Sequence, residues 1–478
     1  MIVTDKSSII TFAIPVFMLL ILIEYCYGIY KGKSNYRLND TFTSLSIGMI
    51  SRYPTMLNLG LQSLIFVYIS KYFNVGLLSV KNPLTWIVAF LLYDLSYYWM
   101  HRMHHEIKIL WATHSVHHHG EEYNLSTALR QTSTGWLWKW IFYLPMVFLG
   151  VPGEVFVTVA GINLVYQFWV HTEHIGHLGF FEKIFITPMN HGIHHAKNKE
   201  YIDANYGGVF IIWDRMFGTY IARDPEIQPV YGTVSALQSW NPIWANFQIF
   251  INMFKDSMKT KKLSDKVKVW FSKTYWRPDD CIEEKDPKDF YIKYDPKVTT
   301  DIKVFSFLQL MFTGIVSTSV LFFLSQLTYN EIFILAVAIT VLSSMTGLLL
   351  EGKRYMYFVI LMFSALGILS IEFFGILNTN ILSTTLLSSQ LYVNIFIVCL
   401  IYIYQSYQGL FELRNAISKF YYKFFKVKSN PENEVLPLIG SKEGIMHISL
   451  AFLNPGDEVL IPNPGYPTYL SVTKLVEA

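Results

Sequence analysis

Thirteen of the fourteen histidines in this chain of 478 residues lie between residues 101 and 195. Neither composition nor packing alone produces such a concentration, so these side chains need a common explanation. Ten of them form the groups HRMHH, HSVHH, HTEH and HGIHH, as His101, His105, His114, His117, His118, His171, His174, His191, His194 and His195. On a helix, residues three or four positions apart share a face, so each group can direct two imidazoles to one point.

Ten imidazoles exceed what one metal ion can hold, but they match two ions with about four or five nitrogen ligands each and one open position. The pattern therefore predicts a di-metal centre with these ten histidines as ligands. Each group lies just outside an apolar run or in the loop after one, which places the predicted metals at the membrane interface, within reach of a lipid chain. We expect the remaining histidines to be surface residues, namely His104, His119, His177 and His447.

The composition predicts a membrane protein, because 52% of the residues are hydrophobic, only 15% are charged and the mean hydropathy is +0.32. Runs long enough to cross a bilayer are Ile9–Ile29, Met56–Phe73, Leu84–Met100, Trp136–Val170 as a helical hairpin, Val304–Leu327, Ile332–Leu350, Tyr355–Leu377 and Leu391–Tyr407. The expected fold class is all-α: a polytopic membrane helical bundle that carries a histidine-rich di-metal cap on its cytoplasmic side.

The cytoplasmic assignment rests on basic residues that follow the apolar runs, since short basic loops stay in the cytoplasm. These residues are Lys31, Lys33, Arg37, Lys353, Arg354, Lys419, Lys423, Lys426 and Lys428. The net charge of +3, without a basic stripe interleaved with aromatics, excludes a nucleic-acid partner. The three cysteines lack the close spacing of a metal knuckle or a redox pair.

Polar residues near the histidines are candidates for supporting roles. Asp94 lies seven residues before His101, on the same helical face, and is predicted to accept a hydrogen bond from an imidazole N–H. The carboxylates nearest in sequence, which we expect to offset metal charge or relay protons, are Glu106, Glu173 and Asp214. The residues of NLSTALRQ that we expect to position substrate or cofactor are Asn124 and Arg130.

The segments YDLSYYWMHRMHHEI, WATHSVHHHGEEYNLSTALRQ, QFWVHTEHIG and NHGIHHAKNKEYIDANYGGVFIIWDRMFGTY resemble the fatty-acid hydroxylase and sterol desaturase superfamily, from near Leu84 to Tyr220. The resemblance implies an O2-dependent di-iron enzyme acting on a lipid, with His171 and His174 extending a core ligand set of His101, His105, His114, His117, His118, His191, His194 and His195. Iron also fits on physical grounds, because attack on an unactivated C–H bond requires a redox metal, which zinc is not.

NLSTALRQ and NYGGVFIIWDRMFGTY narrow the resemblance to a branch that uses tetrahydrobiopterin to hydroxylate the ether-linked carbon of glyceryl ethers. Two alternatives remain open: a sterol, fatty-acid or carotenoid hydroxylase or desaturase with another electron donor, and a membrane metal transporter. Transporters place their ligands within the spans near the midplane, whereas these histidines follow the spans. A metalloprotease is excluded because HExxH is absent from the sequence.

The sequence divides into residues 1–225 as a membrane-embedded catalytic domain, 226–302 as a soluble connection, 303–410 as a second transmembrane block, 411–434 as a basic juxtamembrane segment, and 435–478. The last segment, with GSKEG and Tyr466 in NPGYP, resembles a fragment of class I aminotransferases. We expect it to have no pyridoxal phosphate chemistry of its own. The expected location is a multi-pass position in a bacterial inner membrane or the endoplasmic reticulum, with a lipid substrate, O2 and the membrane as partners.

Overall fold

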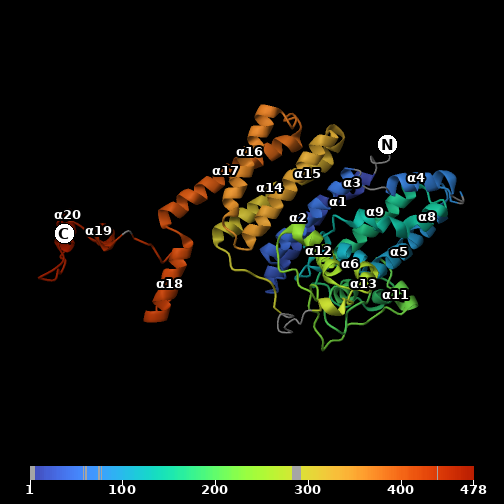
Figure 1. The fold of residues 1–478 in the computed structure, drawn as a ribbon, viewed down its shortest axis with the longest axis horizontal. Helices are drawn as coiled ribbons and strands as arrows, with labels where there is room; N and C mark the ends of the chain where they lie inside the picture. The colour runs from blue at the N-terminus through green and yellow to red at the C-terminus, as the bar shows by residue number, and fades with distance from the viewer. Residues whose placement is uncertain are drawn as a thin grey trace. The chain divides into compact units, whose positions relative to one another are not determined.

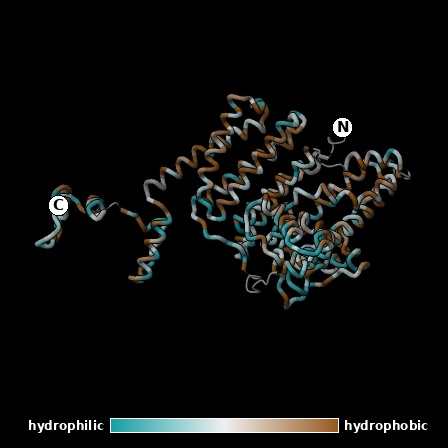
Figure 2. Tube along the Cα trace, viewed as in Figure 1, coloured by the Kyte–Doolittle hydropathy of each residue, from teal (hydrophilic) through white to brown (hydrophobic). Residues whose placement is uncertain are grey.

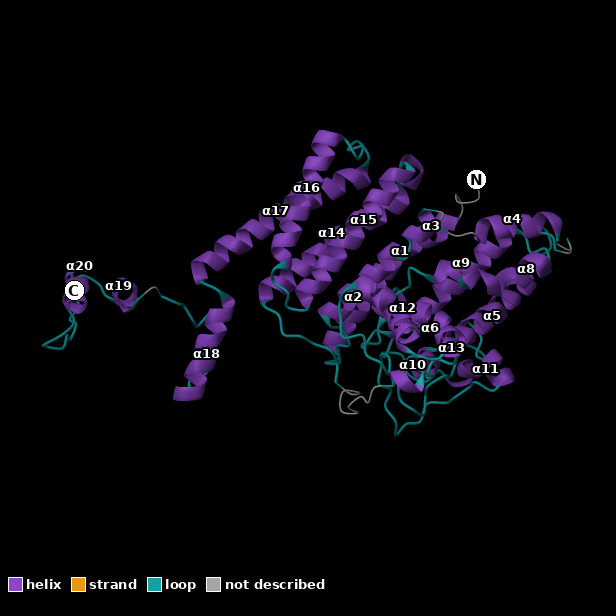
Figure 3. Ribbon diagram, viewed as in Figure 1, coloured by secondary structure: helices purple, strands orange, loops and turns teal. Residues whose placement is uncertain are grey.

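The secondary structure of this computed structural model is helical. The structure describes residues 6–57, 59, 62–73, 76, 78–282, 292–438 and 440–478. Within these residues, helices alternate with loops and no strand forms (Figure 3). The all-α prediction is therefore confirmed. By their contacts the residues separate into two units, Met1–Ile395 and Phe396–Ala478.

The first unit contains the histidine-rich region and most of the apolar helices (Figure 1). In chain order its helices are α1 (Lys6–Tyr30), α2 (Leu38–Ile50), α3 (Tyr53–Met56), α4 (Gln62–Tyr72), α5 (Pro83–Glu106), α6 (Lys108–His118), α7 (Leu125–Ala128), α8 (Leu144–Phe148), α9 (Gly153–Trp169), α10 (Pro188–His194), α11 (Ile212–Phe217), α12 (Pro242–Lys259), α13 (Leu263–Phe271), α14 (Thr300–Phe322), α15 (Tyr329–Leu350) and α16 (Met356–Phe374). Helix α17 (Leu382–Gln408) runs into the second unit, which holds α18 (Phe411–Phe425), α19 (Ser441–Phe452) and α20 (Pro467–Leu475).

Local signals explain where the histidine-bearing helices begin. The side chain of Asn82 accepts a hydrogen bond from the backbone N–H of Leu84, and Pro83 occupies the first turn of α5. Thr187 caps α10 in the same way, and Pro188 follows it. Helix α5 packs against both α6 and α9, which brings the HRMHH and HSVHH motifs to the end of α9, where HTEH begins.

Among the described residues, five helices are long and apolar enough to cross a membrane: Phe12–Tyr30, Thr300–Phe322, Tyr329–Leu350, Met356–Phe374 and Leu382–Ile403. Figure 2 shows hydrophobic residues along most of α14, α15 and α16. The chain is therefore an integral membrane protein, as expected. Three predicted spans are not among the five, because α4 has 11 residues, α9 has 17, and α5 carries Asp94, tyrosines and histidines that lower its hydropathy.

The contact between α2 and α7 depends on Gly48. A Cβ atom built there lies 2.3 Å from the carbonyl oxygen of Leu129, which is backbone and cannot rotate away. We expect Gly48→Ala to separate the two helices and lower the free energy of unfolding by about 2 kcal/mol, measured by denaturation in detergent. Gly314→Ala on α14 is the matched control, since nothing lies within 4 Å of its Cβ position. Equal stability of the two variants would contradict the prediction.

Candidate metal centre

Nine buried histidines form two groups whose nitrogen atoms point at common centres. The first group contains His101, His105, His114, His118 and His194, and the second contains His117, His171, His191 and His195. Within each group the ligand atoms lie within 4.8 Å of one another. The groups adjoin, since the rings of His118 and His195 stack with centroids 4.4 Å apart. The groups contain histidine alone, as the sequence indicated.

Two of the sequence motifs contribute ligands to both groups. On α6, His114 and His118 share one face and join the first group, while His117 turns toward the second. HGIHH divides in the opposite sense, because His191 and His195 join the second group and His194 the first. Helical periodicity therefore lets α6 and the α10 segment, which ends with its C-cap residue His195, each serve two adjacent sites.

The orientation of the rings fits a cation held between them. His117 and His171 donate from Nδ1 to the carbonyl oxygens of Arg130 and Gln167, at 3.0 and 2.9 Å. Since a neutral imidazole has one N–H, each Nε2 atom then carries a lone pair, and these two atoms lie 3.2 Å apart. Facing lone pairs repel unless a cation lies between them. An ion about 2.1 Å from two nitrogens at right angles separates them by about 3 Å.

Burial keeps these imidazoles in the form that binds metals. It lowers the pKa of His171 to about 4 and lowers the pKa of His101, His117 and His194 well below the usual value. At neutral pH the rings are therefore uncharged, and each offers a nitrogen lone pair rather than a second proton. Nine neutral nitrogen donors fit two ions of the class that imidazole prefers, which includes iron.

A single loop orients three ligands of the first group. The carbonyl oxygens of Ala204 and Tyr206 accept hydrogen bonds from Nδ1 of His194 and His101, at 2.9 and 2.8 Å. The carboxylate of Asp203 lies 3.7 Å from Nδ1 of His105. Such contacts fix the ring direction and raise the basicity of the ligand nitrogen. None of these three acceptors was identified from the sequence, because two of them are backbone atoms.

Asp214 stabilises the same loop through hydrogen bonds to its backbone. Its carboxylate accepts hydrogen bonds from the backbone N–H groups of Tyr206 and Gly207, at 2.7 and 2.8 Å, and from the hydroxyl of Thr219. Burial raises the pKa of Asp214 to about 6. The predicted part of Asp214 in charge compensation or proton relay stays a prediction, and its visible role is to hold the loop.

Asp94 is fully buried on α5, seven residues before the ligand His101 on the same helix. Its carboxylate accepts hydrogen bonds from the backbone N–H groups of Val209 and Phe210 and from the side chains of Trp213 and Asn163, so four donors, none an imidazole, fill it. Gly208 permits this approach, because a Cβ there would lie 2.8 Å from Asp94 Oδ1. A catalytic role for Asp94 stays a prediction.

The other predicted polar residues also take part in contacts that shape the site. Glu106 forms ion pairs with Arg102 and Lys273, at 2.8 and 2.5 Å. Asn124 caps α7 by accepting from the backbone N–H of Ser126, and its amide donates to the carbonyl of Asn35. The expected role of Glu106 in charge compensation or proton relay and that of Asn124 toward substrate or cofactor stay predictions. Glu173 is exposed and hydrogen-bonded to Tyr231.

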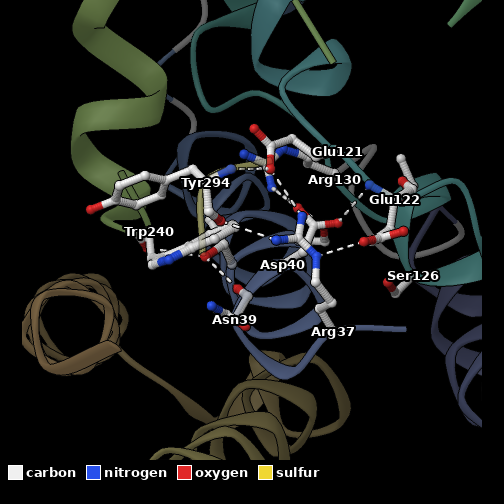
Figure 4. A network of polar contacts seen from close by, with 12 residues as sticks. Arg37, Asn39, Asp40, Glu121, Glu122, Ser126, Arg130, Trp240 and Tyr294 are labelled. Atoms are coloured by element: carbon white, nitrogen blue, oxygen red, sulfur yellow. Dashed lines mark hydrogen bonds and ion pairs between the residues drawn. The ribbon is translucent and has the colours of Figure 1, made fainter. Parts of the chain in front are cut away.

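A network of charged residues lies beside HSVHH (Figure 4). Arg37 binds Glu121 at 2.9 Å and Glu122 at 2.5 Å, and it donates to the carbonyl of Tyr294. Arg130 is fully buried, where its guanidinium donates to the carbonyl of Val116 at 2.7 Å and lies 3.9 Å from Asp40. Arg130 therefore holds α6, the helix that carries His117, through its guanidinium and its own carbonyl oxygen.

The remaining histidines lie outside both groups. His174, predicted as a ligand, packs edge-on against Tyr27 of α1 with ring centroids 5.2 Å apart, and its ligand role stays a prediction. The surface prediction is correct for His177 but wrong for His104 and His119, which are buried. His104 donates from Nδ1 to the carbonyl of Met100 one turn earlier, so helical packing accounts for its burial.

Residues 86–219, which contain both histidine groups, match the model of the family described as fatty acid hydroxylase. Alkylglycerol monooxygenase of Homo sapiens is 40% identical over 267 residues, which is 56% of this chain and 59% of the relative. The match to the Xenopus tropicalis protein of the same name spans 58% of that relative. The Danio rerio protein is 35% identical over 72% of this chain and 78% of its own length. No solved structure matches the chain.

Residues 401–478 match the model described as aminotransferase class I and II, as GSKEG and NPGYP indicated. LL-diaminopimelate aminotransferase of Dehalococcoides mccartyi is 53% identical over 75 residues, which is 19% of that relative. The matched segment includes the basic residues 411–434. Through the histidine-rich first unit and its similarity to the Danio rerio protein over most of that protein's length, the chain belongs to the fatty acid hydroxylase family and is homologous to the alkylglycerol monooxygenases.

Proposed function

We propose that this chain is a membrane-bound di-iron monooxygenase that hydroxylates the ether-linked carbon of alkylglycerols, with O2 and a reduced pterin. The observation that carries the proposal is the convergence of nine buried histidines on two adjacent centres in a chain homologous to alkylglycerol monooxygenases. The name of these relatives, alkylglycerol monooxygenase, supplies the substrate class and the reaction type. The pterin rests on the resemblance of NLSTALRQ and NYGGVFIIWDRMFGTY to the tetrahydrobiopterin-dependent branch.

The proposed reaction inserts one oxygen atom of O2 into a C–H bond next to the ether oxygen. The second oxygen atom leaves as water, for which the reduced pterin supplies two electrons and two protons are taken up. The hydroxylated carbon is a hemiacetal, which breaks down to an aldehyde and glycerol. Iron held by the two histidine groups would supply the redox chemistry that activates O2.

The chain's own residues determine the environment of this chemistry. A shell of neutral imidazoles would hold two metal ions without compensating their positive charge. Backbone carbonyls hold the rings of His101, His117, His171 and His194 so that their Nε2 atoms stay directed at the centres. All nine rings are buried, which excludes bulk water from the ligand atoms. We place the site on the cytoplasmic side of the bundle, next to the ends of the apolar helices.

The test is an incubation of iron-loaded membranes with a glyceryl ether, shifted from anaerobic to aerobic conditions, with and without reduced pterin. We expect aldehyde to form only when ether, O2 and pterin are all present, as detected by mass spectrometry. Membranes containing His117→Ala protein are the matched control. Aldehyde formation without pterin would reject the pterin as donor. Turnover of a sterol, fatty acid or carotenoid in place of the ether, or metal flux without turnover, would reject the ether-lipid function.

A further inference from the structure

Glu24 is a carboxylate inside the first candidate membrane span, Phe12–Tyr30. Only 6% of its surface is exposed, whereas its neighbours Leu22 and Ile23 are 56% and 53% exposed, as expected for side chains that face lipid. An ionisable side chain within a membrane helix is costly, so it needs partners and usually marks a functional position. Glu24 has three such partners, and all are neutral hydrogen-bond donors.

The two carboxylate oxygens of Glu24 bind different segments of the chain. Oε1 accepts from the hydroxyl of Thr172 at 2.5 Å. Oε2 accepts from the backbone N–H of Leu125 at 2.8 Å and from the hydroxyl of Tyr36. Glu24 therefore connects the loop after α9 with the beginning of α7, which are 47 residues apart in the sequence.

These two segments support the two ligands of the second group whose lone pairs face each other. Thr172 directly follows His171. Leu125 begins α7, and Arg130, whose N–H bonds the carbonyl of Thr127 in that short helix, accepts from Nδ1 of His117. The Nε2 atoms of His171 and His117 lie 3.2 Å apart. A shift of either segment changes this spacing directly.

A second hydrogen bond joins the same segments on their other side. The hydroxyl of Tyr123 donates to the carbonyl of Val170 at 2.7 Å, just before His171. This bond joins two uncharged groups within the histidine-rich region, whereas Glu24 lies on α1, a candidate membrane span. The carboxylate therefore adds a hydrogen-bonded connection from α1 to the segments that carry the second histidine group.

We propose that Glu24 is a positioning residue of the second metal site, acting through Thr172 and Leu125 on the spacing of His171 and His117. The inference rests on the di-metal part of the proposed function and is independent of its substrate. Glutamine at this position removes the charge but can keep both contacts, because its oxygen accepts from the N–H of Leu125 and its amide can donate to the hydroxyl of Thr172. Leucine keeps neither contact.

The test measures iron in the purified full-length protein, in detergent, rather than turnover. For Glu24→Leu we expect a fall from about two irons per chain to about one, with loss to a chelator about 10-fold to 100-fold faster at one site. Mössbauer spectra should lose one of two signals and keep the other. Thr172→Val removes only the hydrogen bond from the Thr172 hydroxyl to Glu24, so it should cause a smaller loss of iron from the same site. In the double variant the loss should not exceed that of Glu24→Leu alone.

Glu154→Gln is the matched control, because this carboxylate on α9 is exposed, and it should retain iron as the unchanged protein does. Retention of both irons at unchanged rates in Glu24→Leu and Thr172→Val would overturn the proposal. Equal loss from both sites together with a lower unfolding temperature would also overturn it, since it would indicate a general role in folding. If the unchanged protein holds two irons but forms no aldehyde, the ether-lipid function fails while the role of Glu24 stands.

Discussion

Replacing His117 with alanine is expected to remove iron from the second site and to lower turnover by about 1,000-fold or more, because redox chemistry requires both metals. His117 Nε2 lies 3.2 Å from that of His171, and its Nδ1 is fixed by Arg130, so no neighbouring side chain can take its place. The measurement is iron per chain, by plasma emission spectroscopy, together with aldehyde formation under saturating substrate.

His194→Ala provides the complementary case, since His194 belongs to the first group. We expect it to empty the first site, so the two variants should lose different Mössbauer signals while both lose turnover. His447→Ala is the control, because this histidine is exposed on α19, where it pairs with Glu443 and lies outside both histidine groups. If His117→Ala kept two irons and full turnover, the assignment of the second group as a metal site would be wrong.

The sequence predicted the nine histidines that converge, because ligand spacing on a helix follows from its 3.6-residue period, and it also named His174, which lies outside both groups. It did not predict how they divide, since HSVHH could direct all three rings to one centre. The division depends on the packing of α6 between α5 and the α10 segment, which no local pattern specifies. The Nδ1 acceptors were also out of reach, because the carbonyls of Arg130, Gln167, Ala204 and Tyr206 have no side-chain signature.

Polar residues near the membrane were harder to interpret than the histidines. Asp94 was expected to meet an imidazole, but the turn at Gly208 offers it two backbone N–H groups. No role was predicted for Glu24 from the sequence, although a lone carboxylate in an apolar run often marks a functional position. Its partners Thr172 and Leu125 are more than 100 residues away, so only the fold identifies them.

The basic residues 411–434 show how composition can suggest two different environments. Their lysines and aromatic residues follow an apolar helix, which is typical of a segment at a membrane surface. The aminotransferase match begins at residue 401 and includes them. An amphipathic helix with a basic face has the same composition in a soluble enzyme, so composition alone does not separate the two cases.

Asn205 is expected to control how tightly the first site holds iron, although it lies behind the ligands rather than among them. It lies between Ala204 and Tyr206, whose carbonyls orient His194 and His101. Its backbone is left-handed, with φ 56°, and its buried amide bonds the backbone of Asn190 and Ile221 at 3.1 and 2.9 Å. The side chain therefore stabilises a conformation that most residues avoid.

Asn205→Ala removes these bonds and disfavours the left-handed backbone, so both carbonyls should move away from Nδ1 of His194 and His101. We expect iron to leave the first site about 10-fold to 100-fold faster in the presence of a chelator, with the second site unchanged. Asn205→Gly restores the backbone freedom without the side-chain bonds, so its rate of iron loss should lie between those of the unchanged protein and Asn205→Ala. Gln238→Ala is the control, since Gln238 also has a positive φ, 49°, but is exposed. Loss from the second site instead, or no difference between Asn205→Ala and the Gln238→Ala control, would show that the loop does not set the ligand geometry.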